Sequence, residues 1–341
     1  MESFNKIFGR DFVVGFFVPA AMMIAALAGI LDAFGILPAW LRINGDDPLK
    51  DGTFLALLAI VAAFFLMAGN RMVFRTLEGY WVYDIGRRLN HFQRWKFRSL
   101  KKRINELNLE YKQCEIAGKP FTKQEKRRRL SLEESQHFPS TESQVLPTAF
   151  GNAVRAFEDY PRVMYGFTSI NGWSRLNAFI PKTFQEILGN RRATTDFWVN
   201  VWFVSLFTMA EYFVVAVKLK YGILHEAIPL GCVALAVFAA GQARSAAVQW
   251  GEWVKAAFDI YLPSLRTGLG LARQSTVGGE KDMWLNVSRA FIYRDPESLR
   301  LLQNCRSPEA SNGEGIDRRG RGTETEETVG EPESEEAEEN D

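Results

Sequence analysis

The chain has 341 residues, of which 47% are hydrophobic and 24% charged, and its net charge is +1. Its cysteines, Cys114, Cys232 and Cys305, lie far apart, which excludes a disulfide framework and the usual spacing of a zinc site. The small net charge averages unlike parts: residues 74–195 hold 22 Lys or Arg, whereas the last twenty residues hold ten acids and no base. Apolar residues collect in four blocks, as in a membrane protein.

The four apolar blocks predict four membrane-spanning helices, because a helix needs about 20 mainly apolar residues to cross the hydrocarbon core. The blocks occupy about residues 12–31, 52–70, 197–217 and 227–243, and the last is the shortest. A short loop joins the members of each pair. We therefore expect an all-α fold with two transmembrane hairpins, within residues 1–73 and 196–245. The first block is too long for the core of a cleaved signal peptide.

Lys and Arg residues beside the spans predict the orientation. The long middle segment begins with Arg71 and Arg75 and ends with Arg191 and Arg192, whereas the loop at 32–51 holds four Asp and two bases. Since positive charge favours the cytoplasmic side, the middle segment and both termini should be cytoplasmic. The expected location is the plasma membrane, with the lipid bilayer as the first partner.

Two ridges of small residues indicate where helices could pack closely in lipid. Their members recur every four positions: Ala21, Ala25 and Gly29 in the first span, and Cys232, Ala236 and Ala240 in the fourth. We expect these ridges to form the seam of the bundle, although alanine is also simply common in such helices. Pro19 should kink the first span and leave a carbonyl that a neighbouring helix must satisfy.

Glu211 is the strongest single candidate for a functional residue, because it is an acid inside the third apolar block. Helical rise places it ~6 Å from the midplane of the span. A charge near the bilayer centre costs ~2.5–3.5 kcal/mol on insertion scales. Glu211 could therefore line an ion or proton path. Alternatively, it makes a polar contact that fixes helix packing, or the span begins later and places it near the headgroups.

Residues 74–136 predict a charged cytoplasmic hairpin in which a long helix extends from the second span, turns at 117–120 and returns antiparallel. A coiled-coil-like seam marks the first helix: Leu100, Ile104, Leu107, Tyr111 and Cys114. The basic runs at 101–103 and 126–129 could bind anionic lipid or nucleic acid. We favour a solvated helix face, so nucleic acid is not an expected partner.

The remaining cytoplasmic parts divide at composition changes. Residues 137–195 predict short amphipathic helices with breaks at Pro161 and at Asn171-Gly172, and residues 246–306 predict a further helical region interrupted at Pro263. The apolar face within 246–262 either packs on the other cytoplasmic helices, which we favour, or lies on the membrane surface. Residues 307–341 are predicted to be a disordered acidic tail.

No motif of a known chemistry occurs in the chain, which lacks a phosphate-binding loop, a dinucleotide fingerprint, an H-E-x-x-H zinc motif and a nucleophile elbow. We therefore predict no catalytic, cofactor-binding or metal-binding residue. A pair of catalytic carboxylates has no spacing rule in sequence, so an enzyme stays open as an interpretation.

A pattern of turn and polar residues spans 146–166: Leu146-Pro147-Thr148, Gly151-Asn152, Arg155, Glu158, Tyr160-Pro161 and Tyr165-Gly166. Together with Trp250-Gly251 and the run at 256–259, it resembles a family of uncharacterised bacterial multi-pass, four-helix membrane proteins. The resemblance implies a bacterial plasma-membrane location, and no activity carries over from it. It makes one set of residues a candidate interaction element: Asn152, Arg155, Glu158 and Tyr160. The alternative is a turn-rich connector.

Three functions follow as hypotheses. We prefer a non-enzymatic scaffold whose cytoplasmic helices bind a protein partner or a second copy of the chain. The alternative is an oligomeric ion channel or small transporter that uses Glu211. The third is a membrane enzyme that acts on lipid, which would need carboxylates gathered at the cytoplasmic face.

Overall fold

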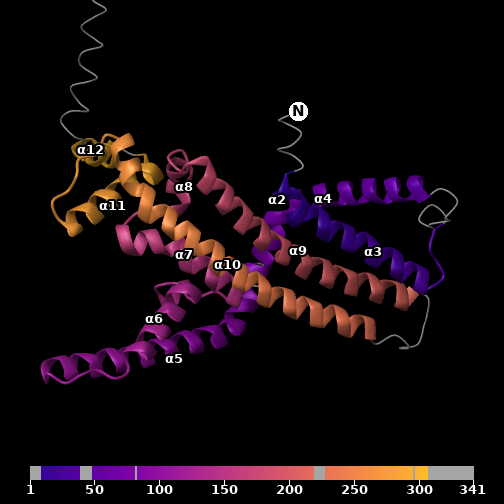
Figure 1. Ribbon diagram of the computed structural model, residues 1–341, viewed down its shortest axis with the longest axis horizontal. Helices are drawn as coiled ribbons and strands as arrows, with labels where there is room; N and C mark the ends of the chain where they lie inside the picture. Colours follow the sequence, from indigo (N-terminus) through magenta and orange to yellow (C-terminus); the bar gives the residue numbers. More distant parts are fainter. Residues whose placement is uncertain (1–8, 39–47, 81–82, 219–226, 295, 306–341) are drawn as a thin grey trace, which may run out of the picture.

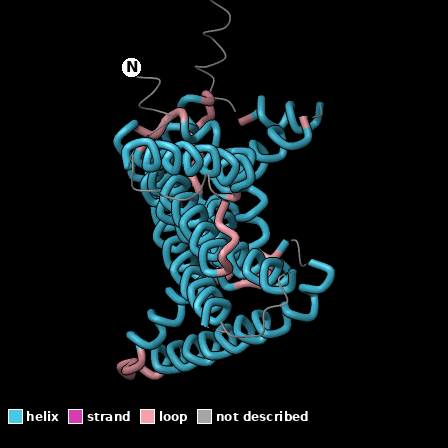
Figure 2. Tube along the Cα trace, turned by 90° about the vertical axis from the view of Figure 1, so that its right-hand side faces the viewer, coloured by secondary structure: helices cyan, strands magenta, loops and turns pink. Residues whose placement is uncertain are grey.

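A computed structural model describes residues 9–38, 48–80, 83–218, 227–294 and 296–305. The regular elements in these residues are helices, joined by short loops (Figure 2). The predicted acidic tail at 307–341 lies outside the described residues. The all-α class is therefore confirmed for the described part of the chain.

Four of the helices are long and apolar enough to cross a membrane. The first runs from Arg10 to Ala33 as α2 (Arg10–Phe12), a π-helical turn η1 (Val13–Phe17) and α3 (Val18–Ala33). The others are α4 (Pro48–Glu78), α9 (Lys182–Lys218) and α10 (Ala227–Gly268). Each predicted span falls inside one of these helices. By length and composition they make the chain a multi-pass membrane protein.

The spans pair as two hairpins: α3 packs on α4, and α9 packs on α10. Figure 1 shows that the linked ends of both pairs point the same way, while the remaining helices gather at the opposite end. Buried residues of α3, α4 and α9 join the hairpins, and their apolar cluster contains Ala20, Ala63 and Val204. We call this four-helix part the bundle, and the helices at its other end the helical body.

The two predicted ridges are used differently in the bundle. Ala236, in the ridge of the fourth span, is buried. In the first span, Ala25 and Gly29 are exposed, and a Cβ built on Gly29 would meet nothing within 4 Å. The seam of α3 is formed one position earlier, at the fully buried Ala20. Among the described residues of the single chain, no helix therefore packs closely against Gly29.

The kink expected at Pro19 takes the form of the π-helical turn directly before it. The Val18 N–H donates to the Val13 carbonyl, five residues back, instead of to the residue four back. Pro19 has no N–H to offer the Gly15 carbonyl. The side-chain amide of Asn200, fully buried on α9, donates to that carbonyl at 2.8 Å. A neighbouring helix thus satisfies the freed backbone group, as the sequence predicted.

The helix that follows the second span is interrupted, contrary to the continuous helix expected from 74 onward. Gly79 has φ +97°, which ends α4 and allows α5 (Tyr83–Ile116) to leave in a new direction. A turn with Gly118 at φ +63° leads into α6 (Gln124–His137). Figure 1 shows α5 and α6 side by side as an arm that extends away from the bundle.

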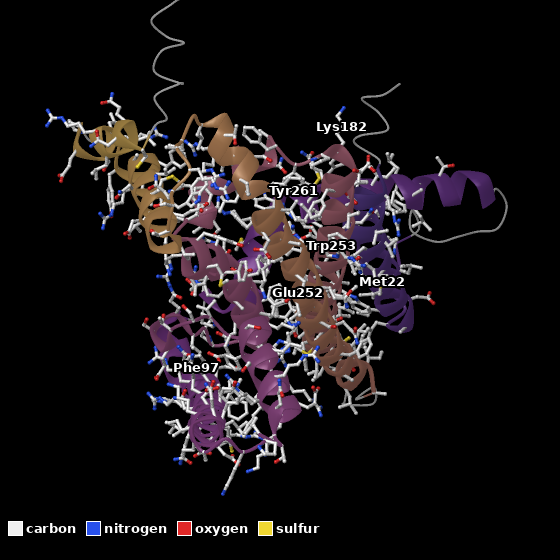
Figure 3. The ribbon with its side chains drawn as sticks, turned by 60° about the vertical axis from the view of Figure 1, so that its left-hand side comes forward. Met22, Phe97, Lys182, Glu252, Trp253 and Tyr261 are labelled. Carbon is white, nitrogen blue, oxygen red and sulfur yellow. The ribbon has the colours of Figure 1, made fainter. Side chains whose placement is uncertain are left out.

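The arm has a small core of its own. Leu100, Ile104 and Leu107 of the predicted seam are buried together with Leu130 of α6. Phe97 adds a ring contact to Phe138 at 5.7 Å, and its place on the arm is labelled in Figure 3. The spacing of 4, 3 and 4 therefore marks the packed face of α5, as the sequence predicted.

The helical body is built around α7 (Ala149–Tyr165), α8 (Ser169–Asn177), α11 (Val277–Tyr293) and α12 (Pro296–Asn304), with a 3-10 turn η4 (Glu142–Gln144) before them. Its centre is the fully buried Trp284, whose ring lies 4.9 Å from that of Phe167. The far half of α10 belongs to the same core through Val254 and Phe258. Packing of 246–262 on the helical body is thereby confirmed.

Two expected helix ends were wrong. Pro161 lies inside α7, which continues to Tyr165, and Pro263 lies inside α10, which continues to Gly268. An interior proline costs about 3 kcal/mol. Burial of Leu262 and Leu265 on both sides of Pro263 offsets that cost, since burying a leucine contributes about 1.5–3 kcal/mol.

Asn171-Gly172 also lies within a helix, α8, where a break was expected. The glycine serves packing there, because a Cβ on Gly172 would lie 2.2 Å from the Phe167 ring. Tight contact between helices, and not chain reversal, is therefore the physical reason for this glycine.

His137, at the end of α6, makes the stability of the helical body depend on pH. Burial, and then Arg244 and Lys255 of α10, lower the pKa of His137 from its ordinary 6.5 to about 4. Because the folded-state pKa is the lower one, the unfolded chain binds more protons between these values, and stability falls as the pH falls through this window. We expect His137 alone to contribute a loss of about 1 kcal/mol from pH 7.5 to 5.5, discounted for the partly buried ring and added to the contributions of other groups.

Thermal unfolding of the purified protein at the two pH values measures this loss. Between pH 7.5 and 5.5, His137→Gln should lose about 1 kcal/mol less stability than the wild type, whereas His91→Gln, at an exposed position of α5, should follow the wild type. An equal pH dependence in all three proteins would assign the effect to other groups.

Candidate functional site

A pocket of about 410 Å³ lies between α7, α8, α9 and α10, where the bundle meets the helical body. Its lining is mostly apolar with a few polar groups: Phe157, Glu158, Ser169, Ile170, Trp173, Asn177, Gln185, Leu188, Gly189, Arg192, Trp250, Val254 and Phe258. A concave, largely apolar cavity of this size with a few polar groups is typical of a small-molecule site.

Aromatic rings in edge-to-face and tilted contacts form the apolar wall. Phe157 and Trp250 lie 4.9 Å apart between ring centroids, and Trp173 and Phe258 lie 5.8 Å apart. A Cβ on Gly251 would come within 2.4 Å of the Phe157 ring, so the glycine lets α7 and α10 approach. The wall therefore follows from tight helix packing.

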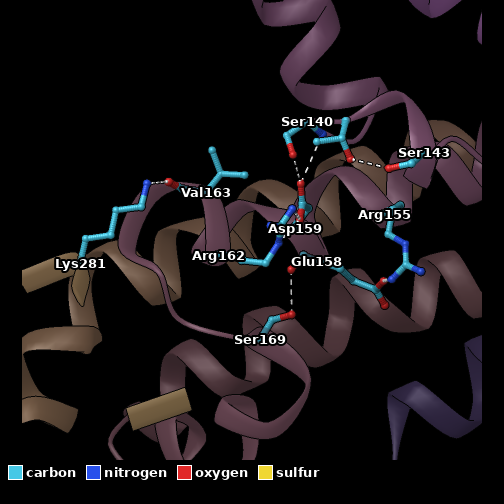
Figure 4. A network of polar contacts seen from close by, with 10 residues as sticks. Ser140, Ser143, Arg155, Glu158, Asp159, Arg162, Val163, Ser169 and Lys281 are labelled. Atoms are coloured by element: carbon cyan, nitrogen blue, oxygen red, sulfur yellow. Dashed lines mark hydrogen bonds and ion pairs between the residues drawn. The ribbon is translucent and has the colours of Figure 1, made fainter. Parts of the chain in front are cut away.

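Glu158 supplies the acidic group of the pocket. Arg155 donates to its carboxylate at 3.2 Å, one turn earlier on α7, and Ser169 donates to its backbone carbonyl at 2.7 Å (Figure 4). Burial raises the pKa of Glu158, and the Arg155 guanidinium opposes part of that rise. The arrangement fixes a half-buried carboxylate whose charge depends on a cation nearby.

Arg192, on α9, supplies the basic group. Its guanidinium lies 5.9 Å from the Trp250 ring, and its Nε is 3.7 Å from an Asp196 carboxylate oxygen. Asn70 of α4 donates to the other oxygen of Asp196 at 3.0 Å. Arg192 thus stands between the pocket and the acidic residues of the bundle.

A second cavity of about 300 Å³ lies on the other side of α9 and shares Gly189 and Arg192 with the first. Its remaining lining comes from the first three spans and includes Asp11, Asn70 and Asp196. A Cβ on Gly189 would lie 2.9 Å from an Asp11 carboxylate oxygen. The two cavities therefore flank one turn of α9.

The four residues of the predicted interaction element occupy different environments on α7. Asn152 is fully buried: it accepts from the Leu146 N–H at 2.7 Å and donates to the Leu146 carbonyl at 3.0 Å. The Tyr160 hydroxyl donates to Asp259 of α10 at 2.9 Å. Glu158 lines the pocket, and Arg155 is its ion-pair partner. The element thus contributes Glu158 to the pocket, and its other residues hold α7 in position.

Glu211 lies on the face of α9 that also carries Thr208. One Glu211 carboxylate oxygen and the Thr208 hydroxyl are buried without a hydrogen-bond partner among the described residues. Ser205, one turn earlier, donates to the Val201 carbonyl at 2.7 Å and so is satisfied within the helix. Glu211 does not line the pocket and belongs to no group of three or more His, Cys, Asp or Glu side chains among the described residues.

In the described ranges, no group of three or more His, Cys, Asp or Glu side chains is placed to hold a metal ion. The pocket could not be predicted from the sequence, because its walls come from four helices that are distant in the sequence. Arg192 was visible only as a marker of membrane orientation. A comparison of the chain with protein-family models, curated proteins and solved structures finds no match.

Proposed function

We propose that the protein is a non-enzymatic membrane scaffold, with the bundle as its anchor and the α5–α6 arm as its partner-binding element. The arm, from residue 83 to residue 137, carries fifteen Lys or Arg against seven Asp or Glu. In the proposed orientation the arm, the helical body and both termini are cytoplasmic, in a bacterial plasma membrane. This orientation rests on the Lys and Arg bias beside the spans.

The observation that carries the proposal is the outer face of α5. Large apolar side chains are exposed there, opposite the packed seam: Trp95 is 63%, Leu109 62% and Ile116 88% exposed. Helical geometry places the three within roughly 60° of one another around the axis. Exposed apolar groups on a basic, prefolded hairpin are typical of an interaction surface for an acidic protein.

Crosslinking in native membranes tests the scaffold. The wild-type protein should give crosslinked complexes that weaken at high salt, and Ile116→Ser together with Trp95→Ser should reduce them. Val277→Ser is the matched control, because Val277 of α11 is 87% exposed and lies off the arm. Recovery of the monomer alone, or equal loss in the control, would contradict the proposal.

A second candidate function is an oligomeric channel or small transporter with Glu211 on the shared path. Its support is the buried carboxylate oxygen of Glu211 that lacks a partner among the described residues. The exposed ridge with Ala25 and Gly29 gives a surface on which another copy could pack. Ion flux in liposomes should then change in Glu211→Gln, and unchanged flux would remove Glu211 from the mechanism.

A further inference from the structure

We propose that the pocket between α7, α8, α9 and α10 binds a zwitterionic amphiphile with a single apolar chain, such as a lysophospholipid whose head carries a phosphate and a primary amine. This site is separate from the outer face of α5, so the proposal does not depend on the scaffold function.

The position of the pocket along the helices supports an amphiphile. Arg192 lies five residues before the predicted third span, and Trp250 lies seven residues after the fourth. At 1.5 Å of rise per residue these are ~7.5 and ~10 Å beyond the hydrocarbon core. The headgroup layer is about 5–8 Å thick on each side of a bilayer. The membrane-side end of the pocket therefore lies at the outer edge of the headgroups, where a lipid can reach it, and the lining out to Gln185 and Phe258 lies farther from the bilayer.

The shape and lining suit one chain. Apolar walls from α7, α8 and α10 include Phe157, Trp173 and Phe258, and they surround about 410 Å³. Pockets of this size bury drug-sized ligands, so a head with the first part of one chain fills the space. Ile170 of α8, which lines the pocket, is 71% exposed and marks its rim.

The charges of the lining select the head. Glu158 of α7 and Arg192 of α9 both line the pocket, so its lining includes one residue of each charge. An anionic head would be attracted by Arg192 but repelled by Glu158. A cationic head would be attracted by Glu158 but repelled by Arg192. A zwitterion pairs its phosphate with the guanidinium and its amine with the carboxylate. The Trp173 ring also lines the pocket, and aromatic rings attract an ammonium group.

The pocket is held open before a ligand arrives. Gln185 donates to the Asn177 and Ile180 carbonyls, each at 2.9 Å, and so ties the start of α9 to the end of α8. The Arg155–Glu158 pair and the Ser169 hydrogen bond fix the α7 side. These contacts fix α7, α8 and α9 around the pocket, which reduces the conformational entropy that binding must cost.

Native mass spectrometry of the full chain in detergent, with a headgroup series of lysophospholipids, tests the site. Lysophosphatidylethanolamine should bind about tenfold more tightly than lysophosphatidylglycerol, which lacks the amine. Glu158→Gln should reduce that preference to about twofold or less, because only the amine pairs with Glu158. Arg192→Gln should weaken both lipids, because both carry the phosphate. Ile170→Trp should weaken the binding of every lipid, because the larger side chain would cover the rim of the pocket.

Arg191→Gln is the matched control, since Arg191 donates to Gln249 and does not line the pocket. It should bind as the wild type does. Thermal unfolding of each variant establishes that it is folded. Equal binding of all headgroups, a preference for the anionic lipid, an unchanged preference in folded Glu158→Gln, or unchanged affinity for both lipids in folded Arg192→Gln would overturn the proposal.

Discussion

Gly151→Ala should lower the free energy of unfolding by about 3 kcal/mol or more, although helix propensity alone predicts a gain of about 1 kcal/mol. A Cβ at Gly151 would lie 2.3 Å from the Glu78 carbonyl oxygen and 3.0 Å from the Glu78 Cα. These are backbone atoms at the end of α4, so no side chain can rotate away. Steric overlap between α7 and α4 therefore outweighs propensity.

The same contact carries hydrogen bonds that separation would break. Thr148 donates to the Glu78 carbonyl at 3.1 Å, and its hydroxyl accepts from the Gly151 N–H at 2.9 Å to cap α7. Loss of this contact would free the helical body from the second span. Limited proteolysis should then cut the variant between residues 79 and 83 faster than the wild type.

Gly69→Ala is the control, because Gly69 lies on α4 and a Cβ there would meet nothing within 4 Å. It should unfold at the wild-type temperature or slightly above. If Gly151→Ala were as stable as Gly69→Ala, α4 and α7 would have to be farther apart than the structure places them.

The sequence predicted the parts of the fold that depend on local composition. Hydropathy located all four spans, since a membrane helix must be apolar along its whole length. The seam at Leu100, Ile104 and Leu107 was also predictable. The spacing of these residues and the helix on which they pack both lie within one hairpin. The breaks were less predictable. Pro263 stays helical because Leu262 and Leu265 are buried in a core formed by distant elements.

The candidate pocket was largely invisible in the sequence. Of its charged residues, Glu158 was selected as part of an interaction element, and Arg192 only for its place beside a span. Their convergence depends on how α7 crosses α9 and α10, which no spacing rule encodes. The signal that could have pointed to it is the pair Gly189 and Gly251, since a helical glycine is costly unless two elements approach there.

Asn200→Leu should lower the stability of the bundle by about 1–2 kcal/mol, because it leaves the Gly15 carbonyl without a donor in apolar surroundings. The need for that donor comes from Pro19, which lacks the N–H that would bond to Gly15. In a Pro19→Ala background the backbone can supply the N–H. Asn200→Leu should therefore cost about 1 kcal/mol less there.

A double-mutant cycle on Pro19 and Asn200, followed by unfolding in detergent, measures the coupling. Equal cost in both backgrounds would mean that Asn200 acts independently of Pro19. Coupling would mean that the buried Asn200 amide on α9 serves to satisfy the Gly15 carbonyl that Pro19 leaves free in the first span. Glu211 has no such reason among the described residues, because its buried oxygen lacks a partner. The two polar residues of the same helix therefore call for different experiments, stability for Asn200 and ion flux for Glu211.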